Sequence, residues 1–234
     1  MPTYTNRSLH GHAVNLIGTR IIRGDYRPGD VLDPVALEHE LEVSRTVIRE
    51  TLRVLGAKGL VGARPRRGTY VRDRADWSLL DADVLHWQFE ADSKALLRDL
   101  GAVREMIEPA SAALAAQQRN DEDVAELADA LEEMSAAGTD PVAVTAADLR
   151  FHRALLAATH NELLIRMSSI IEVGLRARDQ LVHAGEEWTD PVPMHAEVLT
   201  AIRRRQPRKA VNAMRALLSQ ADRESQSSAL PETT

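Results

Sequence analysis

Three side chains in the second half of the chain have the types and spacing of metal ligands. Asp148 and His152 are four residues apart, so on one helix both side chains lie on the same face. His195 falls in a later helical segment and can close a site inside a helical bundle. Two imidazoles and one carboxylate suit zinc, manganese, nickel or iron. The spacing therefore makes these three residues a candidate metal site.

Each of the three residues also has an ordinary structural explanation. Thr145 precedes Asp148 by three residues, which is the spacing of a capping box at the start of a helix. His152 and His195 could be hydrogen-bonded core histidines. The same ligand set also occurs in non-haem iron oxygenases, so a metal-dependent enzyme is the alternative function. Against the enzyme, no general base stands out, and the first 72 residues would have no role.

The elements that must position these residues are helices. Residues beyond 80 are rich in Ala, Leu, Glu and Arg, with helical periodicity and short breakers between segments. The predicted helices lie near 82–91, 95–118, 121–136, 146–158, 161–184, 193–205 and 207–224. Pro109 should bend the second of these helices or split it.

The first third of the chain contains a helix with an arginine face. Apolar positions between 47 and 55 recur at steps of three and four residues, so they share one face. Arg45, Arg49 and Arg53 step by four along another face. Ser44 is placed to cap this helix and Gly59 to end it. Arginine side chains can grip guanine edges or phosphates, although a solvated arginine face on a surface helix is the alternative.

The neighbouring segments complete a DNA-binding arrangement. Residues 15–23 and 35–41 are predicted helices, and the second begins with the strong start signal Asp33-Pro34. Residues 63–71 form a predicted basic hairpin with Gly68 at its turn. Helix, helix, tight turn, helix and hairpin is the order of a winged helix-turn-helix.

Residues 8–72 resemble the GntR family of bacterial transcription regulators. The resemblance is carried by Pro28-Gly29, Leu37, Leu41, Val43-Ser44-Arg45-Thr46, Val47, Arg49-Glu50, Leu52, Leu55, Gly59-Leu60-Val61 and Arg67-Gly68-Thr69-Tyr70-Val71. It implies DNA contacts by the recognition helix and by the wing. The residues expected to make these contacts are Arg45, Thr46, Arg49, Arg53, Arg66, Arg67 and Gly68.

One departure from the family pattern bears on the operator sequence. The family usually starts its second helix with Leu-Pro-x-Glu and often places a DNA-contacting arginine one residue later. The corresponding stretch here is Leu32-Asp33-Pro34-Val35, which lacks that arginine. The operator is therefore expected to differ from the family norm.

The remainder of the chain resembles the FCD effector domain of the FadR-type branch of this family. The matching motifs are Val103-Arg104, Glu108-Pro109, Asp148-Leu149-Arg150-Phe151-His152, Asn161-Glu162-Leu163-Leu164 and the segment around His195. Residues 77–89 resemble the linker of the galactonate-operon repressor subgroup. The resemblance implies a divalent metal at Asp148, His152 and His195, with zinc as first choice and manganese or nickel as alternatives. Many members add a fourth histidine where this chain has Leu217.

The resemblance also implies a small carboxylate effector, such as a sugar acid, beside the metal. Arg104 is the expected carboxylate anchor, because its planar fork fits a carboxylate. Its alternative is an ordinary ion pair with Glu108, four residues later. Arg150 and Trp188 are expected to line the effector site, with a surface or packing role as their alternative.

Charge is divided unevenly along the chain, which has 234 residues and a net charge of −6. Residues 1–75 carry a net charge of +5 and the remainder −11. A basic head on an acidic body fits a DNA-binding regulator. The absence of cysteine and of a transmembrane-length apolar run fits a cytoplasmic protein without membrane attachment.

These observations predict a mainly α protein. Its expected parts are a winged helix-turn-helix over 1–72, a linker and linker helix over 73–94, an all-helical effector-binding and dimerisation domain over 95–224, and a tail over 225–234. The expected function is repression from a palindromic double-stranded operator, which a homodimer reads and an effector releases. Besides the enzyme, a helical scaffold for a protein partner is an alternative, but it leaves the recognition helix and wing without a role.

Overall fold

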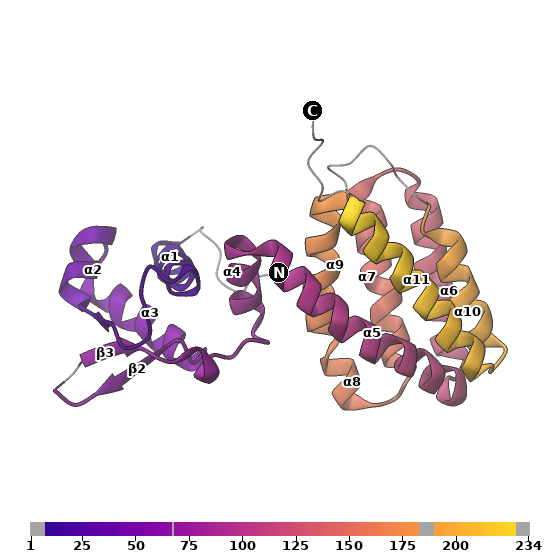
Figure 1. The fold of residues 1–234 in the computed structure, drawn as a ribbon, viewed down its shortest axis with the longest axis horizontal. Coiled ribbons are helices and arrows are strands. Elements are labelled where there is room, and N and C mark those ends of the chain that lie inside the picture. Colours follow the sequence, from indigo (N-terminus) through magenta and orange to yellow (C-terminus); the bar gives the residue numbers. More distant parts are fainter. Residues whose placement is uncertain (1–7, 67, 183–189, 228–234) are drawn as a thin grey trace. The chain divides into compact units, whose positions relative to one another are not determined.

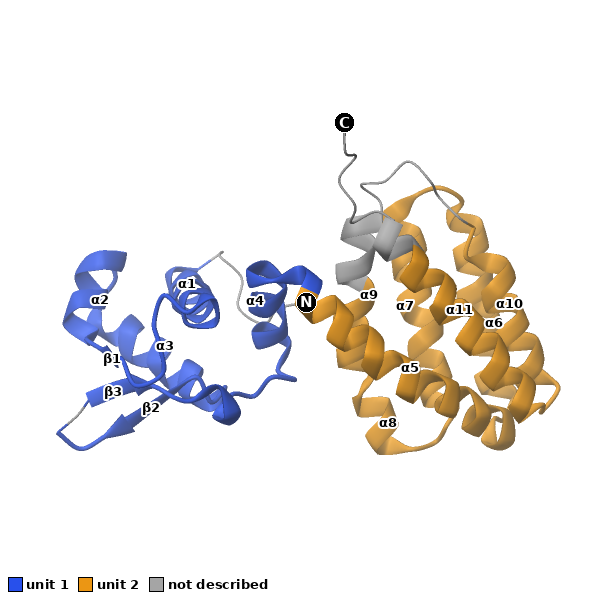
Figure 2. Cartoon of the chain, in the orientation of Figure 1, with its two compact units in different colours: residues 1–94 blue, residues 95–234 orange. Residues whose placement is uncertain are grey.

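The computed structural model describes residues 8–66, 68–182 and 190–227, and the chain divides into two compact units (Figures 1 and 2). Unit 1 covers residues 1–94 and unit 2 covers residues 95–234. Unit 1 holds all the described strands, whereas the elements described in unit 2 are helices. The predicted fold class, a winged helix-turn-helix followed by an all-helical domain, is confirmed.

Unit 1 is built from helices around a small sheet. Its elements are α1 (Leu9–Arg23), β1 (Val31–Leu32), α2 (Pro34–Leu41), α3 (Arg45–Ala57), β2 (Val61–Arg64), β3 (Gly68–Val71), the 3-10 turn η1 (Arg74–Asp76) and α4 (Ala82–Ala91). The sheet has the order β1-β3-β2 with antiparallel neighbours, and β2 and β3 form the wing. Strand β1 was not predicted, because two residues are too few for a periodic pattern to show.

Capping side chains fix where the helices of unit 1 begin. Ser8 accepts a hydrogen bond from the Gly11 amide, so α1 starts six residues before the predicted position 15. Asp33 caps α2 ahead of Pro34, and Ser44 caps α3, as their sequence signals predicted. Caps therefore place the turn between α2 and α3, which is the turn of the helix-turn-helix.

Helix α4, which covers the helix predicted at 82–91 within the linker region 73–94, packs into the core of unit 1. Trp87 is fully buried, and its indole nitrogen donates to the side-chain oxygen of Asn15 in α1. Trp77 and Val84 belong to the same apolar cluster as the winged-helix residues. Gly18 leaves room for the indole, because a Cβ there would lie 2.6 Å from Cη2 of Trp87.

A buried ion-pair cluster joins the end of α3 to the start of α4. Lys58, at the C-terminal end of α3, lies 2.8 Å from Asp81 Oδ1 and 2.6 Å from Asp83 Oδ2. Burial lowers the pKa of Lys58, but the two carboxylates outweigh it and raise that pKa. Separating these partners would leave an uncompensated buried charge, which is costly. The ion pairs therefore hold the start of α4 against the end of the recognition helix.

Unit 2 is a helical bundle. Its helices are α5 (Ser93–Gln118, which begins within unit 1), α6 (Asp121–Ala137), α7 (Pro141–Ala157), α8 (Glu162–Arg166), α9 (Ser168–Val182), α10 (Val192–Arg203) and α11 (Pro207–Ser227). The main core contains residues of α5, α6, α7, α10 and α11, including Phe151, Met134 and Leu155. Within residues 8–66, 68–182 and 190–227, no helix combines the length and apolar character that a bilayer span requires.

Two predicted helix boundaries in unit 2 are wrong. Helix α5 runs through Pro109 as one helix, so of the two predicted effects, a bend or a split, the split does not occur. Helix α7 starts at Pro141 and not near 146, because Asp140 is its N-cap and proline suits the first helical position. The segment predicted as one helix from 161 consists of α8 and α9, with Met167 between them.

Replacing Gly18 by alanine should destabilise unit 1, because the added methyl group would collide with Trp87. Overpacking of this kind costs about 1–3 kcal/mol of unfolding free energy. The matched control is Gly56→Ala in α3, where the nearest atom, the backbone oxygen of Val61, lies 3.7 Å from the new Cβ. The control should keep or raise stability, by up to about 1 kcal/mol, because alanine favours a helix. Denaturant unfolding measures both variants, and equal stabilities would contradict the α1–α4 packing.

Candidate functional site

The recognition helix α3 presents one apolar face and one arginine face. Its buried residues are Ile48, Thr51, Leu52, Val54 and Leu55. The spacing predicted four of these together with Val47, which is partly buried, and missed Val54. The predicted DNA-contacting residues of this helix, Arg45, Thr46, Arg49 and Arg53, are all exposed. Arg53 forms an ion pair with Glu50 one turn earlier. The helix therefore offers its polar face to a partner while the apolar face anchors it.

The wing places cations beside this helix within unit 1. Arg64 on β2 lies over the ring of Tyr70 on β3, 4.8 Å from its centre. Arg66 is exposed in the turn with φ 64°, and Gly68 has φ 81°, a conformation that favours glycine. Arg67 lies outside the described residues.

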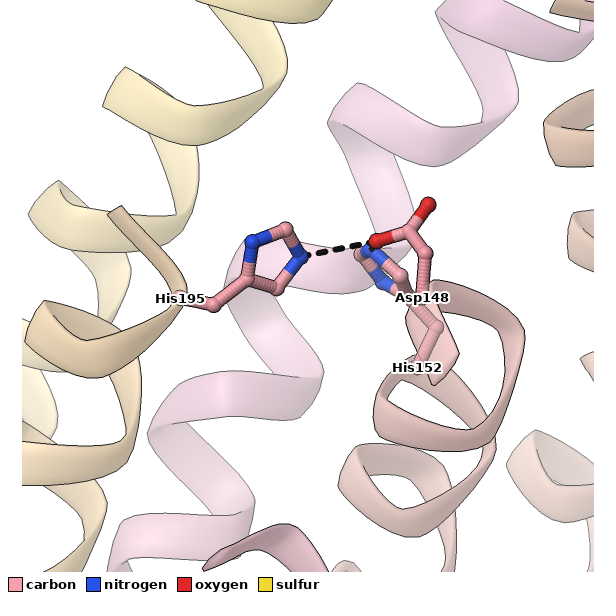
Figure 3. Close-up of side chains that lie close together, drawn as sticks. All are labelled: Asp148, His152 and His195. Atoms are coloured by element: carbon pink, nitrogen blue, oxygen red, sulfur yellow. Dashed lines mark ion pairs between the residues drawn. The ribbon is translucent and has the colours of Figure 1, made fainter. Parts of the chain in front are cut away.

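The candidate metal ligands converge inside unit 2 (Figure 3). Asp148 and His152 come from α7 and His195 from α10, and all three are buried. Their ligand atoms lie within 4.8 Å of one another. Asp148 Oδ1 is 2.8 Å from His195 Nε2 and 3.5 Å from His152 Nε2. Three residues that the sequence singled out are thus brought to one point.

Both histidines are oriented through their other ring nitrogen. His195 Nδ1 lies 2.8 Å from the Pro191 carbonyl oxygen, which can only accept, so Nδ1 carries the proton. His152 Nδ1 lies 2.7 Å from Glu108 Oε2, again an acceptor. Each histidine therefore turns Nε2 toward Asp148. A ligating histidine usually has such a partner on its other nitrogen.

The atoms that face one another at the centre lack hydrogen-bond partners. Among the described residues, Asp148 Oδ1, His152 Nε2 and His195 Nε2 are buried and meet one another only as ion pairs, without a hydrogen bond of acceptable geometry. The same is true of His152 Nδ1 and Glu108 Oε2, which form an ion pair at 2.7 Å. Buried polar atoms are normally satisfied, so three such atoms around one point need an explanation. A divalent cation bound by all three supplies one, and the donor set fits it.

Buried charges determine the protonation of this cluster. Burial alone would raise the pKa of Glu108, but Arg104 and His152 outweigh it and hold that pKa at about 2. Burial alone would lower the pKa of His152, but Glu108 and Asp148 raise it to about 9. The pKa of Asp148 lies well below its usual range, because the histidines outweigh its burial. The metal-free cluster is thus a network of mutually compensating charges.

Two structural alternatives for the metal residues can now be judged. The capping-box explanation of Thr145 and Asp148 is wrong, because α7 begins at Pro141 and Asp148 lies well inside the helix. The explanation as hydrogen-bonded core histidines accounts for Nδ1 of His195, which bonds the Pro191 carbonyl, and for Nδ1 of His152, which pairs with Glu108, but it does not account for the two Nε2 atoms. Their Nε2 atoms are buried and without hydrogen-bond partners among the described residues.

Arg104 contacts Glu108, which in turn contacts the candidate metal ligand His152. Its Nε donates to Glu108 Oε1 at 2.6 Å, so the predicted ion pair at four-residue spacing exists. The Nη2 atom is buried and has no hydrogen-bond partner among the described residues. Helix α9 passes close by, since a Cβ on Gly174 would lie 3.8 Å from Arg104 Cδ. One guanidinium nitrogen therefore remains available to an acceptor.

The other predicted effector residues behave differently. Arg150 was expected to line the effector site. Its guanidinium instead pairs with Glu126 at 2.8 Å and with Glu133 at 2.6 Å, and these ion pairs join α7 to α6. Asp148 and Arg150 are two positions apart on the helix, which turns them to different faces. Trp188 lies outside the described residues. Leu217 is buried in the apolar core and supplies no metal ligand.

Sequence reasoning missed the part that Glu108 takes in the site. Glu108 was considered only as an ion-pair partner of Arg104 and as part of a family motif. In the structure it also contacts His152 on another helix. The four-residue spacing of Arg104 and Glu108 was the available signal, but the contact with α7 depends on the packing of the bundle.

Comparisons with known proteins agree with both units. Residues 9–71 match the bacterial regulatory proteins of the gntR family, and residues 99–220 match the FCD domain. The galactonate operon transcriptional repressor of Escherichia coli (strain K12) is 37% identical over 191 residues, covering 80% of this chain and 83% of the relative. The Uxu operon transcriptional regulator of the same organism is 34% identical over 155 residues, covering 65% of this chain and 59% of the relative.

Solved structures support the fold. The Listeria monocytogenes protein Lar aligns with a TM-score of 0.62 at 18% identity, covering 95% of this chain and 99% of that chain. Streptococcus agalactiae GntR aligns with a TM-score of 0.52 at 24% identity, covering 92% of this chain and 99% of that chain. With both domain families matched in order, the chain belongs to the gntR family of bacterial regulatory proteins, in the branch that carries an FCD domain, and is a transcription regulator and not an enzyme.

Proposed function

We propose that this regulator represses an operon for the breakdown of a sugar acid or a related small carboxylate and leaves its operator when that compound binds. The observation that carries the proposal is the convergence of Asp148, His152 and His195 beside Arg104, in a chain whose first unit exposes a recognition helix. The sugar-acid class is suggested by the name of the galactonate operon repressor, which is similar over most of its length. The setting is the cytoplasm, where operator DNA is found.

The proposed DNA interface consists of the exposed face of α3 and the wing. Arg45, Thr46 and Arg49 would contact base edges or phosphates in the major groove, and Arg53 would contact the backbone. Arg66, Arg67 and Gly68 would enter the minor groove. One winged head reads too little sequence for a specific site, so a homodimer on a palindromic operator is proposed.

The proposed effector site combines the metal ligands with Arg104. A divalent ion, with zinc as first choice and manganese or nickel as alternatives, would be held by Asp148, His152 and His195. When bound, it would supply positive charge for an effector carboxylate at a coordination position that the three protein ligands leave open. Arg104 Nη2, buried and without a partner among the described residues, would donate a hydrogen bond to the same carboxylate. Trp188 is retained as a predicted lining residue.

Release from DNA would follow from a shift in the relative populations of two arrangements of the dimer. An effector can change operator affinity only if it binds one arrangement of the dimer better than another. We propose that the arrangement favoured by the effector spaces the two DNA-binding heads wrongly for the palindrome. The metal and Arg104 would provide the binding energy that selects it.

Arg49→Ala should weaken operator binding by about 10- to 100-fold, because a bidentate arginine–base contact is lost. Fluorescence anisotropy with operator DNA, selected from a random pool by the wild-type protein, measures the affinity. The control Arg166→Ala removes an equally exposed arginine from α8 of unit 2 and should leave affinity unchanged. Wild-type operator affinity in Arg49→Ala would rule out the proposed recognition face.

His152→Ala should weaken metal binding by more than the roughly 100-fold that loss of an outer partner costs. It should also abolish the effector response while operator binding by unit 1 persists. Calorimetry with Zn²⁺ measures the first effect. The matched control His160→Ala removes a half-exposed histidine that pairs with Asp123 and should bind Zn²⁺ normally. Unchanged Zn²⁺ affinity in His152→Ala would refute the metal site.

Metal binding should release a proton at pH 7. Without metal, His152 is protonated there because its pKa is about 9, whereas a metal ligand must be a neutral imidazole. Metal affinity should therefore rise with pH up to the pKa of His152, by roughly tenfold per pH unit for one released proton. Calorimetry in buffers of different ionisation enthalpy counts the proton. An affinity that does not vary with pH would contradict the protonated state of His152.

A further inference from the structure

Glu108 lies between Arg104 and His152 and contacts each of them through a different carboxylate oxygen. Oε1 accepts a hydrogen bond from Arg104 Nε at 2.6 Å. Oε2 lies 2.7 Å from His152 Nδ1. The carboxylate is fully buried, so water does not compete for either oxygen. Arg104 and Glu108 belong to α5 and His152 belongs to α7, so the carboxylate joins two helices.

We infer that Glu108 is the positioning residue of the metal centre, which deepens the proposed function and rests on it. It holds His152 as the tautomer protonated on Nδ1, so that Nε2 faces Asp148 and His195 and can bind a metal. Its other oxygen fixes the Arg104 guanidinium through Nε and leaves Nη2 for an effector carboxylate. The metal ligand and the carboxylate anchor thereby share one support.

The two neighbours of Glu108 explain why this position needs a carboxylate. Arg104 Nε and the Nδ1 of a metal-binding His152 are both donors, and an ionised carboxylate only accepts. Glutamine has one acceptor oxygen and a donating amide. Because the arginine is a permanently charged donor, the amide oxygen of a glutamine here should face Arg104. The amide NH₂ would then face His152, make Nδ1 an acceptor and place the proton on Nε2, where it blocks the metal.

Sharing one support also links metal and effector affinities. An interaction that holds both the metal ligand and Arg104 contributes to both binding free energies. Loss of Glu108 should therefore weaken both metal binding and carboxylate binding. This distinguishes Glu108 from a residue that only stabilises the fold.

The test is Zn²⁺ affinity in the full-length Glu108→Gln variant, with Zn²⁺ as the sole probe. The affinity should fall about 10- to 100-fold, as expected when the partner of a ligating histidine is removed. The matched control is Glu105→Gln, which removes the same charge from an exposed position of the same helix and should bind Zn²⁺ normally. Wild-type affinity in Glu108→Gln would overturn the inference.

Nitrogen-15 NMR of the histidine rings gives a readout that a merely structural role would not move. In the Zn²⁺-loaded wild type, His152 should carry its proton on Nδ1 and be bound through Nε2. In Glu108→Gln the proton should move to Nε2. If that variant does not fold, the wild-type spectrum decides, since metal bound through Nδ1 overturns the role of Glu108.

The outcomes separate this inference from the proposed function. Zn²⁺ binding by the wild type that Glu108→Gln fully retains would overturn the positioning role and leave the metal site intact. A wild type that binds neither Zn²⁺, Mn²⁺ nor Ni²⁺ would overturn the metal site and, with it, any role for Glu108 in positioning a ligand.

Discussion

The mutual compensation of buried charges in unit 2 is the constraint on which the proposed site depends. Arg104, Glu108, His152 and Asp148 are all buried, and each would be costly to bury alone. They form a continuous series of contacts from α5 to α7, and His195 extends it to α10. The series ends in three atoms without hydrogen-bond partners in the described part of the unit. The bundle thus brings together a buried cluster whose charges compensate one another and whose three facing atoms we propose as metal ligands.

The arrangement of unit 1 determines how a signal from unit 2 can reach DNA. Helix α4 shares the core of the winged helix, and Lys58 ties its start to the end of α3. Along the chain, only Asp92 separates α4 from α5, the helix that carries Arg104 and Glu108. In the proposed mechanism, a change at the effector site would reach the head along the chain through α4, which belongs to the core of unit 1.

Much of the fold and the juxtaposition of Asp148 and His152 could be predicted from sequence because their signals are local. The arginine face of α3, the caps Asp33 and Ser44, and the spacing of Asp148 and His152 all follow from helical periodicity. The features that were missed depend on tertiary packing. The burial of Trp87 against Gly18, the contact of Glu108 with His152 and the pairing of Arg150 with α6 join segments far apart in sequence. No periodic pattern encodes such contacts.

The most direct test of the account is operator affinity of the purified protein during titration with a panel of sugar acids, with and without a metal chelator. Coupling through the metal centre predicts that one sugar acid releases the operator from the metal-loaded protein and that chelation removes this response. Release that is indifferent to chelation would contradict the central claim that the effector acts through the metal held by Asp148, His152 and His195.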